Sequence, residues 1–187
     1  MSVYDVCPVL KSEHFTLRLV EREDAPGLLK VYSDERAVPL FNGDNCNGDD
    51  FHYTTMERME QAIDFWLKSY YEWKCFVRWT ILAGDEPIGT VELFHREAED
   101  AFNHHGLLRL DLRSDYERLS VLLELLELIH RYAYELFDCP ILATKAPAFA
   151  GERCGALARS GYIASASRIV GHAGTEYGDY WVRPEKN

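Results

Sequence analysis

Two carboxylates in strand-like segments are the residues of this chain whose position best suits proton transfer. Glu92 and Asp111 each lie in a short run that alternates apolar and polar side chains. A carboxylate on a strand face can act as a general base, either directly or through a water molecule. For Asp111 we favour an Arg–Asp–Arg ladder with Arg109 and Arg113, because charges paired on one strand face need no catalytic reason. For Glu92, a general base and a solvated strand face both stay open.

Other residues that could carry chemistry have simpler explanations. His104 and His105 have no third ligand at helical or hairpin spacing, so we interpret them as solvated loop residues and expect no metal. Cys154 lies near the start of a predicted helix, which stabilises a thiolate. No paired base is visible, and a small buried apolar side chain is the preferred role. The Asp- and Asn-rich loop 41–52 lacks the terminal Glu of a calcium loop.

The composition indicates one globular domain spanning residues 1–187. Hydrophobic residues make up 47% of the 187 residues, and charged residues make up 27%. The formal net charge is −11, which disfavours a nucleic-acid partner because phosphate backbones are also negative. Acidity suits a cationic partner such as an amine or a basic peptide, although solubility alone is the preferred explanation of the charge.

Cysteine usage and hydropathy favour a cytoplasmic protein. The five cysteines form no CxxC pair and no even disulfide framework, which fits a reducing compartment. The first residues show no basic region followed by an apolar run, so we expect no signal peptide. The longest apolar stretch, 119–129, is interrupted by Glu124 and Glu127, so we expect no membrane partner.

The hydrophobic periodicity predicts an α/β (α+β) fold, in which helices pack against a single layer of sheet. Strands are predicted at 15–20, 76–83, 88–94, 106–113, 140–146, 162–166 and 177–183. Helices are predicted at 25–33, 54–72, 118–137 and 152–159. The helix at 118–137 has the strongest pattern, with a broad apolar face along its whole length.

Four short motifs add to this order of elements. They are Phe15-Thr-Leu-Arg-Leu-Val-Glu-Arg-Glu-Asp24, Pro87-Ile-Gly-Thr-Val-Glu-Leu93, Arg159-Ser-Gly-Tyr162 and Tyr177-Gly-Asp-Tyr-Trp-Val182. In their order and spacing the chain resembles the GNAT acyltransferases over residues 13–184, and in particular the branch that modifies ribosomal-protein N-termini and related amines.

This resemblance implies a mixed, mostly antiparallel central sheet flanked by helices. It also implies transfer of an acetyl group from acetyl-CoA to an amine, carried by a small molecule or a peptide. In the family, pantetheine lies between the fourth and fifth strands, and the pyrophosphate binds the loop and helix start that follow the fourth strand. The implied cofactor-binding residues are Leu110, Leu112, Arg113, Arg118, Leu119, Ser120 and Val121. A backbone N–H near Leu112 would polarise the thioester carbonyl. The first two helices and the 41–52 loop, with mixed acidic and aromatic residues, would form the acceptor side and suit a cationic amine.

The chain departs from the family at the phosphate loop. The pattern Q/R-x-x-G-x-G/A falls on residues 117–122, where Glu117 replaces the Gln or Arg. Ser120 replaces the first Gly, and Leu122 replaces the last small residue. Glu117 adds a negative charge beside an anionic ligand, and a side chain in place of Gly keeps phosphate away from the backbone amides. We therefore expect a weakened or remodelled cofactor site, with Leu122 turned toward the core as an alternative.

The catalytic acid of the family is also replaced. Many relatives use a Tyr four residues before their Gly-Phe pair, and that position is Leu157 in this chain. Tyr116, beside the phosphate loop, is the candidate substitute that could protonate the leaving thiolate. Two hypotheses follow: an N-acyltransferase that uses acetyl-CoA, or a catalytically inactive GNAT-like domain that serves as a binding or regulatory module. Both allow a homodimer.

Overall fold

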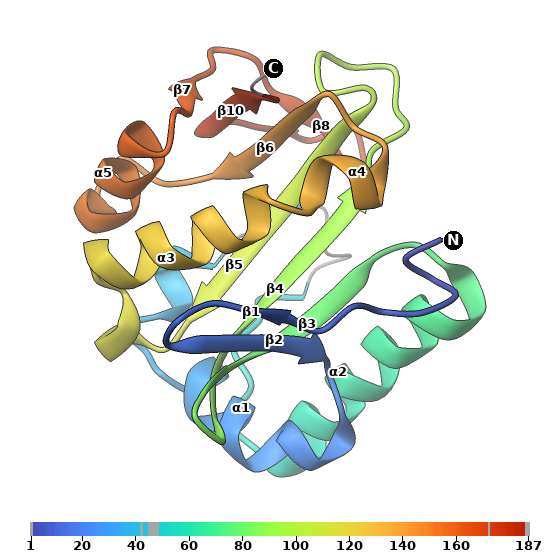
Figure 1. The fold of residues 1–187 in the computed structure, drawn as a ribbon, viewed down its shortest axis with the longest axis vertical. Helices are drawn as coiled ribbons and strands as arrows, with labels where there is room; N and C mark the ends of the chain where they lie inside the picture. The colour runs from blue at the N-terminus through green and yellow to red at the C-terminus, as the bar shows by residue number, and fades with distance from the viewer. Residues whose placement is uncertain (1, 42, 45–48, 172, 186–187) are drawn as a thin grey trace.

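A single twisted sheet of eight strands organises the chain. The computed structural model describes residues 2–41, 43–44, 49–171 and 173–185 (Figure 1). The strands of this sheet, in spatial order, are β1 (Leu10–Lys11), β2 (Phe15–Leu19), β3 (Val77–Ala83), β4 (Glu86–His95), β5 (His105–Leu112), β6 (Ile141–Lys145), β10 (Tyr180–Pro184) and β7 (Ile163–Ala164). Only the β5–β6 pair is parallel, so the sheet is mixed and mostly antiparallel, as the sequence predicts.

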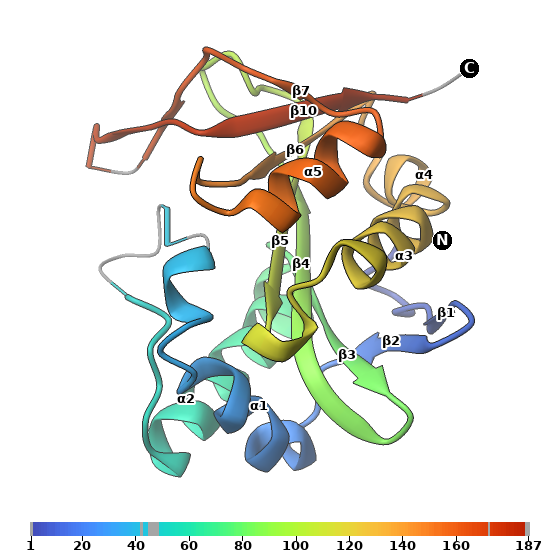
Figure 2. The same ribbon diagram turned by 90° about the vertical axis from the view of Figure 1, so that its left-hand side faces the viewer.

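Helices cover both faces of this sheet. They are α1 (Ala25–Tyr32), α2 (Met56–Lys68), α3 (Leu119–His130), α4 (Ala133–Phe137) and α5 (Gly151–Arg159), with short helical turns at Arg22–Asp24, Val38–Leu40, Ser69–Trp73 and Ser114–Tyr116. Figure 2 shows α1 and α2 on one side of β3–β5 and α3 and α4 on the other. Two separate apolar clusters fill these two layers.

Local sequence explains why these elements form. In α2 the Thr55 side chain accepts a hydrogen bond from the Arg58 amide and caps the helix. Met59, Ile63 and Trp66 then recur at helical spacing and are all buried. In β5 the alternation has the predicted result, since Leu108, Leu110 and Leu112 pack against the α3–α4 layer while Asp111 faces α1.

Three details of the sequence-based prediction are wrong. The helix predicted over 118–137 is broken at Tyr132, where φ is −124° and ψ is −27°, so α3 and α4 are separate. The break lets Ala133, Tyr134 and Phe137 face the core. Strands β1 and β8 (Ile169–Val170) were not predicted, because two-residue strands have no readable alternation. The strand predicted at 177–183 is divided at Asp179, where φ is 63°, into β9 (Glu176–Tyr177), which pairs with β8, and β10.

The strands β5 and β6 diverge, and this creates the gap that matters for function. They pair only along His105–Leu108 of β5 and Ile141–Thr144 of β6. Figure 1 shows the two strands separating toward α5. The Arg113 amide donates to the Ile88 carbonyl of β4, and peptide groups alternate in direction along a strand. The peptide groups of Leu110 and Leu112 therefore point away from β4, into the gap.

Candidate active site

A buried polar network lies between the sheet and the α1–α2 layer. The Tyr32 hydroxyl donates to Asp111 Oδ2 at 2.7 Å and lies 2.7 Å from Thr90 Oγ1. Arg78 Nη1 donates to the same three groups, at 3.1 Å to Tyr32 Oη, 3.1 Å to Thr90 Oγ1 and 3.4 Å to Asp111 Oδ2. Its Nη2 pairs with Glu92. All five side chains are buried, which is costly for charged groups unless they are paired.

Glu92 is held as a carboxylate in this network. Burial alone would raise its pKa, but the charges of Arg78 and Arg109 and the Arg78 hydrogen bond outweigh burial and hold the pKa below its ordinary value. Arg109 Nε lies 3.3 Å from Glu92 Oε1. Glu92 therefore pairs with two guanidinium groups, and its lowered pKa makes it a weak base.

Asp111 behaves in the opposite way. Burial raises the pKa of its carboxyl above the ordinary value, against the opposing charge of Arg78 and the hydrogen bond from Tyr32. Its Oδ1 is buried and has no hydrogen-bond partner among the described residues. The predicted ladder is not formed, because Arg113 turns away to pair with Glu86 and Asp115. A carboxyl group with a raised pKa and an unused oxygen has the properties of a general base.

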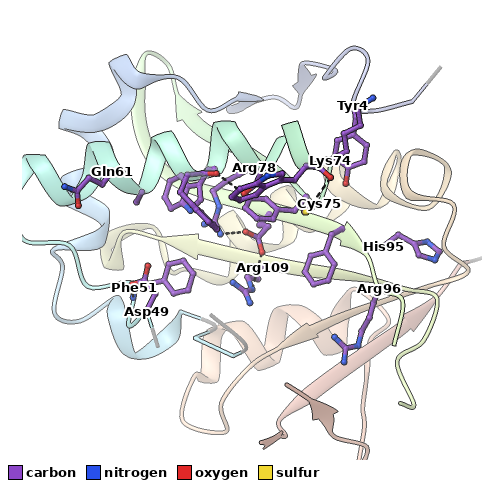
Figure 3. Close-up of a pocket in the computed structure, with 18 of the residues that line it drawn as sticks. Tyr4, Asp49, Phe51, Gln61, Lys74, Cys75, Arg78, His95, Arg96 and Arg109 are labelled. Carbon is purple, nitrogen blue, oxygen red and sulfur yellow. Dashed lines mark hydrogen bonds and ion pairs between the residues drawn. The ribbon is translucent and has the colours of Figure 1, made fainter. Parts of the chain in front are cut away.

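A large pocket opens on the same side of the sheet. It has a volume of about 980 Å³ and lies between α2, the segment 73–76 and strands β3–β5. Arg78, Glu92 and Arg109 form its floor, and Figure 3 shows Phe51 beside them, with Gln61 toward one end and Tyr4 and His95 toward the other. Eight aromatic side chains line it: Tyr4, Phe51, Tyr53, Phe65, Trp66, Trp73, Phe76 and Phe94.

The charge of this pocket differs from the sequence-based expectation. Five cations line it (Arg58, Lys74, Arg78, Arg96 and Arg109), against three acids (Asp49, Glu92 and Glu97). The predicted acceptor side is indeed aromatic, but cations outnumber acids in a chain whose net charge is −11. Two of the cations arise from β3 and β5, and the expectation counted only the helices and the loop. The pocket therefore attracts a negative group as well as an apolar one.

The gap between β5 and β6 contains side chains of the protein itself. Arg153 Nη1, from α5, donates to the Leu110 carbonyl at 2.6 Å. Arg153 Nε and Nη2 donate to the two carboxylate oxygens of Glu117, at 2.7 and 2.8 Å. The Glu152 carboxylate accepts a hydrogen bond from the Leu119 amide, in the first turn of α3, at 2.6 Å.

The predicted cofactor-binding residues lie on β5 and at the start of α3, on the β5 side of this gap. Leu110 and Leu112 contribute inward-facing peptide groups, while their side chains are buried in the core. Arg118 precedes α3 as its N-cap residue. The remaining positions are Arg113 at the end of β5, and Leu119, Ser120 and Val121 in the first turn of α3. Arg153 and Glu117 lie beside the Leu110 peptide group, and Glu152 lies at the first turn of α3.

The remaining sequence candidates lie outside this arrangement. Tyr116 lies beyond β5, where Arg113 and Arg118 cover its ring at 5.2 and 5.7 Å from the centroid. Leu122 is buried in the core, the alternative that its sequence position left open. Burial raises the pKa of Cys154, so the helix start does not activate this thiol.

The histidines and acidic residues form no metal site in the described ranges. His104 Nδ1 lies 3.1 Å from His95 Nε2, and His105 Nδ1 lies 3.0 Å from the Asn103 carbonyl. No group of three His, Cys, Asp or Glu side chains within those ranges could hold an ion. Part of the predicted loop 41–52, namely 42 and 45–48, lies outside the described residues. No described helix is long and apolar enough to cross a bilayer.

Sequence reasoning missed three members of the site: Tyr32, Arg78 and Arg153. Tyr32 reads as an apolar-face residue of the helix predicted at 25–33, and its hydroxyl reaches Asp111 only because α1 packs across β4. Arg78 faces Glu92 through the β3–β4 register, which the sequence does not fix. Arg153 had one available signal, since an acid stands at position 117 where the family has Gln or Arg, and such an acid needs a partner.

Comparisons with known proteins agree with this geometry. The family model described as acetyltransferase (GNAT) domain matches residues 14–150. Among curated protein sequences no match is found. Solved structures with the same fold include a ribosomal-protein alanine acetyltransferase from Vibrio fischeri, with a TM-score of 0.70 and 14% identity over 96% of this chain and 98% of that one.

Two other solved structures are similar to the chain. An acetyltransferase from Salmonella typhimurium that modifies the N-terminal serine of a 50S ribosomal subunit protein has a TM-score of 0.68 and 12% identity, over 96% of this chain and 100% of that one. The ribosomal-protein N-acetyltransferase RimL, in complex with coenzyme A, has a TM-score of 0.67 and 13% identity, over 95% and 98%. At these identities the structures show the fold, and the domain match shows the family. The chain belongs to the GNAT acetyltransferase family.

Proposed function

We propose that this protein transfers an acetyl group from acetyl-CoA to a primary amine, with Asp111 as the general base. The observation that carries the proposal is the position of Asp111 between two peptide groups, those of Leu110 and Leu112, that point into the β5–β6 gap. A thioester bound in that gap would lie next to its carboxyl group. The raised pKa of Asp111 makes it a stronger base than Glu92.

The residues around the gap fit acetyl-CoA in three respects. The Leu110 and Leu112 peptide groups offer a donor and an acceptor for the amides of pantetheine. The Leu112 N–H could polarise the thioester carbonyl, which is worth several kcal/mol when the donor is preorganised. The first turn of α3 offers backbone amides and a positive dipole to the pyrophosphate. When bound, acetyl-CoA supplies the activated acyl group, and this chain supplies orientation and the base.

The reaction needs a proton taken from the amine and a proton given to the leaving thiolate. An amine is protonated at neutral pH and must lose a proton before its nitrogen can attack the thioester. Asp111 takes this proton, directly or through one water molecule. Tyr32 and Arg78 donate to Asp111 and hold it in place, and Thr90 in turn contacts Tyr32 and Arg78. Tyr116 stays a candidate for the acid that protonates the leaving thiolate.

The pocket beside Asp111 supports a particular kind of acceptor. Its aromatic walls suit a ring or a bulky apolar group. Arg58 and Lys74 make no ion pair within the described part of the chain, so they are available to a carboxylate. We therefore propose an amine with an aromatic or large apolar group and a carboxylate, either a small molecule or a peptide.

An acceptor screen tests this proposal. Acetyl-CoA is offered with phenylalanine, alanine and phenethylamine, and acetylated products are measured by mass spectrometry. Phenylalanine should give the highest kcat/KM, because alanine lacks the ring and phenethylamine lacks the carboxylate. Arg58→Ala should raise KM for phenylalanine about tenfold, the effect of losing one charge-assisted contact, and leave phenethylamine unaffected. Glu60→Ala, on the exposed side of α2, is the matched control.

The competing hypothesis is a catalytically inactive domain. It would be favoured if no amine in the screen gave product while acetyl-CoA still bound. A preference for alanine or phenethylamine over phenylalanine would contradict the acceptor class but leave acetyl transfer intact.

The four described cysteines are all free, which supports a cytoplasmic location for this activity.

A further inference from the structure

An ion pair bridges the β5–β6 gap (the donor gap), and one of its members, Glu117, is a departure from the family pattern. Glu117 stands in the phosphate loop, and Arg153 projects from α5 on the other side of the gap. The two side chains form a bidentate pair and are only 9% and 6% exposed. Such a pair is geometrically specific, and it is stable in a buried place only when its other hydrogen bonds are also satisfied.

Arg153 satisfies its remaining hydrogen bond where pantetheine would bind. Its Nη1 donates to the Leu110 carbonyl, which has no strand partner on this side because the pairing of β5 with β6 ends at Leu108. The guanidinium group therefore takes the place of an amide donor of the ligand. Its charge also acts on Asp111, since Arg153 is among the groups that lower the pKa of that carboxyl against the larger effect of burial.

The neighbouring residue occupies the place of the phosphates. Glu152 precedes Arg153 in α5, and its carboxylate accepts the hydrogen bond of the Leu119 amide. A carboxylate at a helix N-terminus has the same favourable interaction with the helix dipole as a phosphate. Two consecutive residues of one helix thus fill both halves of the donor site.

We propose that Glu117, Glu152 and Arg153 set the affinity of this protein for its acyl donor by occupying the donor gap themselves. This inference rests on the proposed acetyl transfer. In the free protein the three side chains replace the amide and phosphate contacts of the ligand, and acyl-CoA binds only when Arg153 leaves the Leu110 carbonyl and Glu152 leaves the Leu119 amide. Among the unusual residues of the phosphate loop, Glu117 is therefore part of an internal closure together with Glu152 and Arg153 of α5.

Calorimetric titration with donor fragments tests the closure. The double variant Glu117→Ala/Arg153→Ala should bind acetyl-CoA and acetyl-pantetheine at least tenfold more tightly than the wild type. Glu152→Gln should bind acetyl-CoA and adenosine 3′,5′-bisphosphate more tightly, and acetyl-pantetheine equally. Arg18→Ala breaks a bidentate pair with Asp24 on the β2 side of the sheet, and it should leave all three affinities unchanged.

A second variant and two further measurements, of proton exchange and of the pH–rate profile, keep the test decisive. If the double alanine variant does not fold, Glu117→Gln/Arg153→Met keeps most of the volume and carries the same prediction. In the wild type, the Arg153 Nε–H resonance should be protected from exchange in the free protein and lose that protection when acetyl-CoA saturates the site. Arg153→Met should also raise the pKa seen in the pH–rate profile, because a cation near Asp111 is removed.

The closure and the function can fail separately. Equal dissociation constants for the wild type and the gap variants, or an Arg153 resonance unchanged by acetyl-CoA, would overturn the closure while leaving turnover untouched. Tighter binding in the variants, with no product from any amine, would support the closure and contradict the proposed acetyl transfer.

Discussion

Asp111 and Glu92 share Arg78 as a partner, yet the protein shifts their pKa values in opposite directions. Glu92 meets two guanidinium groups, and their charges exceed the cost of burial. Asp111 shares Arg78 with Tyr32 and Thr90 at longer distances, so burial dominates. The two carboxylates therefore have different roles. Glu92 offsets the charge of Arg78 and Arg109, and Asp111 can accept a proton.

This difference predicts opposite effects of two isosteric substitutions on stability. Glu92→Gln should lower the free energy of unfolding by about 3 kcal/mol, because it removes one partner of a buried ion pair. Asp111→Asn should raise that free energy at neutral pH, because an amide avoids the burial of a charge and can still accept from Tyr32. Urea unfolding at pH 7 measures both, and a loss of stability in Asp111→Asn would contradict the account.

The pH dependence of the Asp111 effect has a defined sign. A carboxyl whose pKa is raised on folding contributes most to stability below its unfolded value, near pH 4, and loses this contribution as pH rises through the folded pKa. The advantage of Asp111→Asn over the wild type should therefore be small near pH 4 and grow toward neutral pH. A constant difference across this range would show that the carboxyl is not perturbed.

At the scale of single residues, the sequence allowed prediction of the carboxylates but not of their partners. Glu92 and Asp111 were visible as acids in alternating segments. Arg78 reads as an outward polar residue of its strand, and only the pairing of β3 with β4 and of β4 with β5 places it between the two acids. Residue type indicates the chemistry, whereas the register and the helix layer above decide which groups meet.

Among the elements, the close approach of β4 and β5 positions Asp111. A Cβ atom at Gly89 would lie 2.2 Å from the Asp111 carbonyl and 2.9 Å from the Leu112 side chain. Only a residue without a side chain therefore fits at this point of β4. This explains the glycine in the motif Pro87-Ile-Gly-Thr-Val-Glu-Leu93.

Gly89→Ala should move β5 and misplace the base. We expect a loss of about 1–3 kcal/mol of stability from overpacking, together with at least a tenfold fall in turnover. Urea unfolding and a steady-state assay measure the two effects. Gly43→Ala is the control, because a Cβ atom there meets nothing within 4 Å. Full activity in Gly89→Ala would show that the approach of the strands does not set the catalytic geometry.

The elements themselves were largely predictable, since each long strand and helix has a clear period. The break between α3 and α4 was not, because the apolar positions continue through it and propensity alone favours one helix. The divergence of β5 from β6 was expected from the family resemblance and not from any pattern. The internal ion pair in the gap was not expected, because residues 117 and 153 are distant in sequence.

Across the whole molecule, Asp44 links the two parts of the sheet that separate at the gap. Its carboxylate accepts from the Tyr180 hydroxyl at 2.7 Å and from Lys145 Nζ at 2.8 Å, and its carbonyl accepts from Arg109 Nη2 at 2.5 Å. Arg109 belongs to β5, while Lys145 and Tyr180 belong to β6 and β10. We propose that residues 1–187 form one domain, since this connection and the sheet join both parts.

Asp44→Ala should therefore destabilise the fold by about 3 kcal/mol, because it removes the buried carboxylate that accepts from the partly exposed Lys145 and from the buried Tyr180 hydroxyl. Glu99→Ala removes an exposed acid and should change stability by less than about 0.5 kcal/mol. Guanidinium unfolding compares the two variants with the wild type. Equal stability of Asp44→Ala and the wild type would mean that the β5–β6 pairing alone holds the parts together.

The central claim is acetyl transfer to an amine with Asp111 as the base, and the most direct test is the steady-state release of coenzyme A with the best acceptor from the screen. We predict turnover by the wild type and a fall in kcat/KM of about 100-fold or more in Asp111→Asn, the usual contribution of a general base, with a folded variant of equal or higher stability. Equal rates for the two proteins, or no release of coenzyme A by the wild type with any amine, would contradict the account.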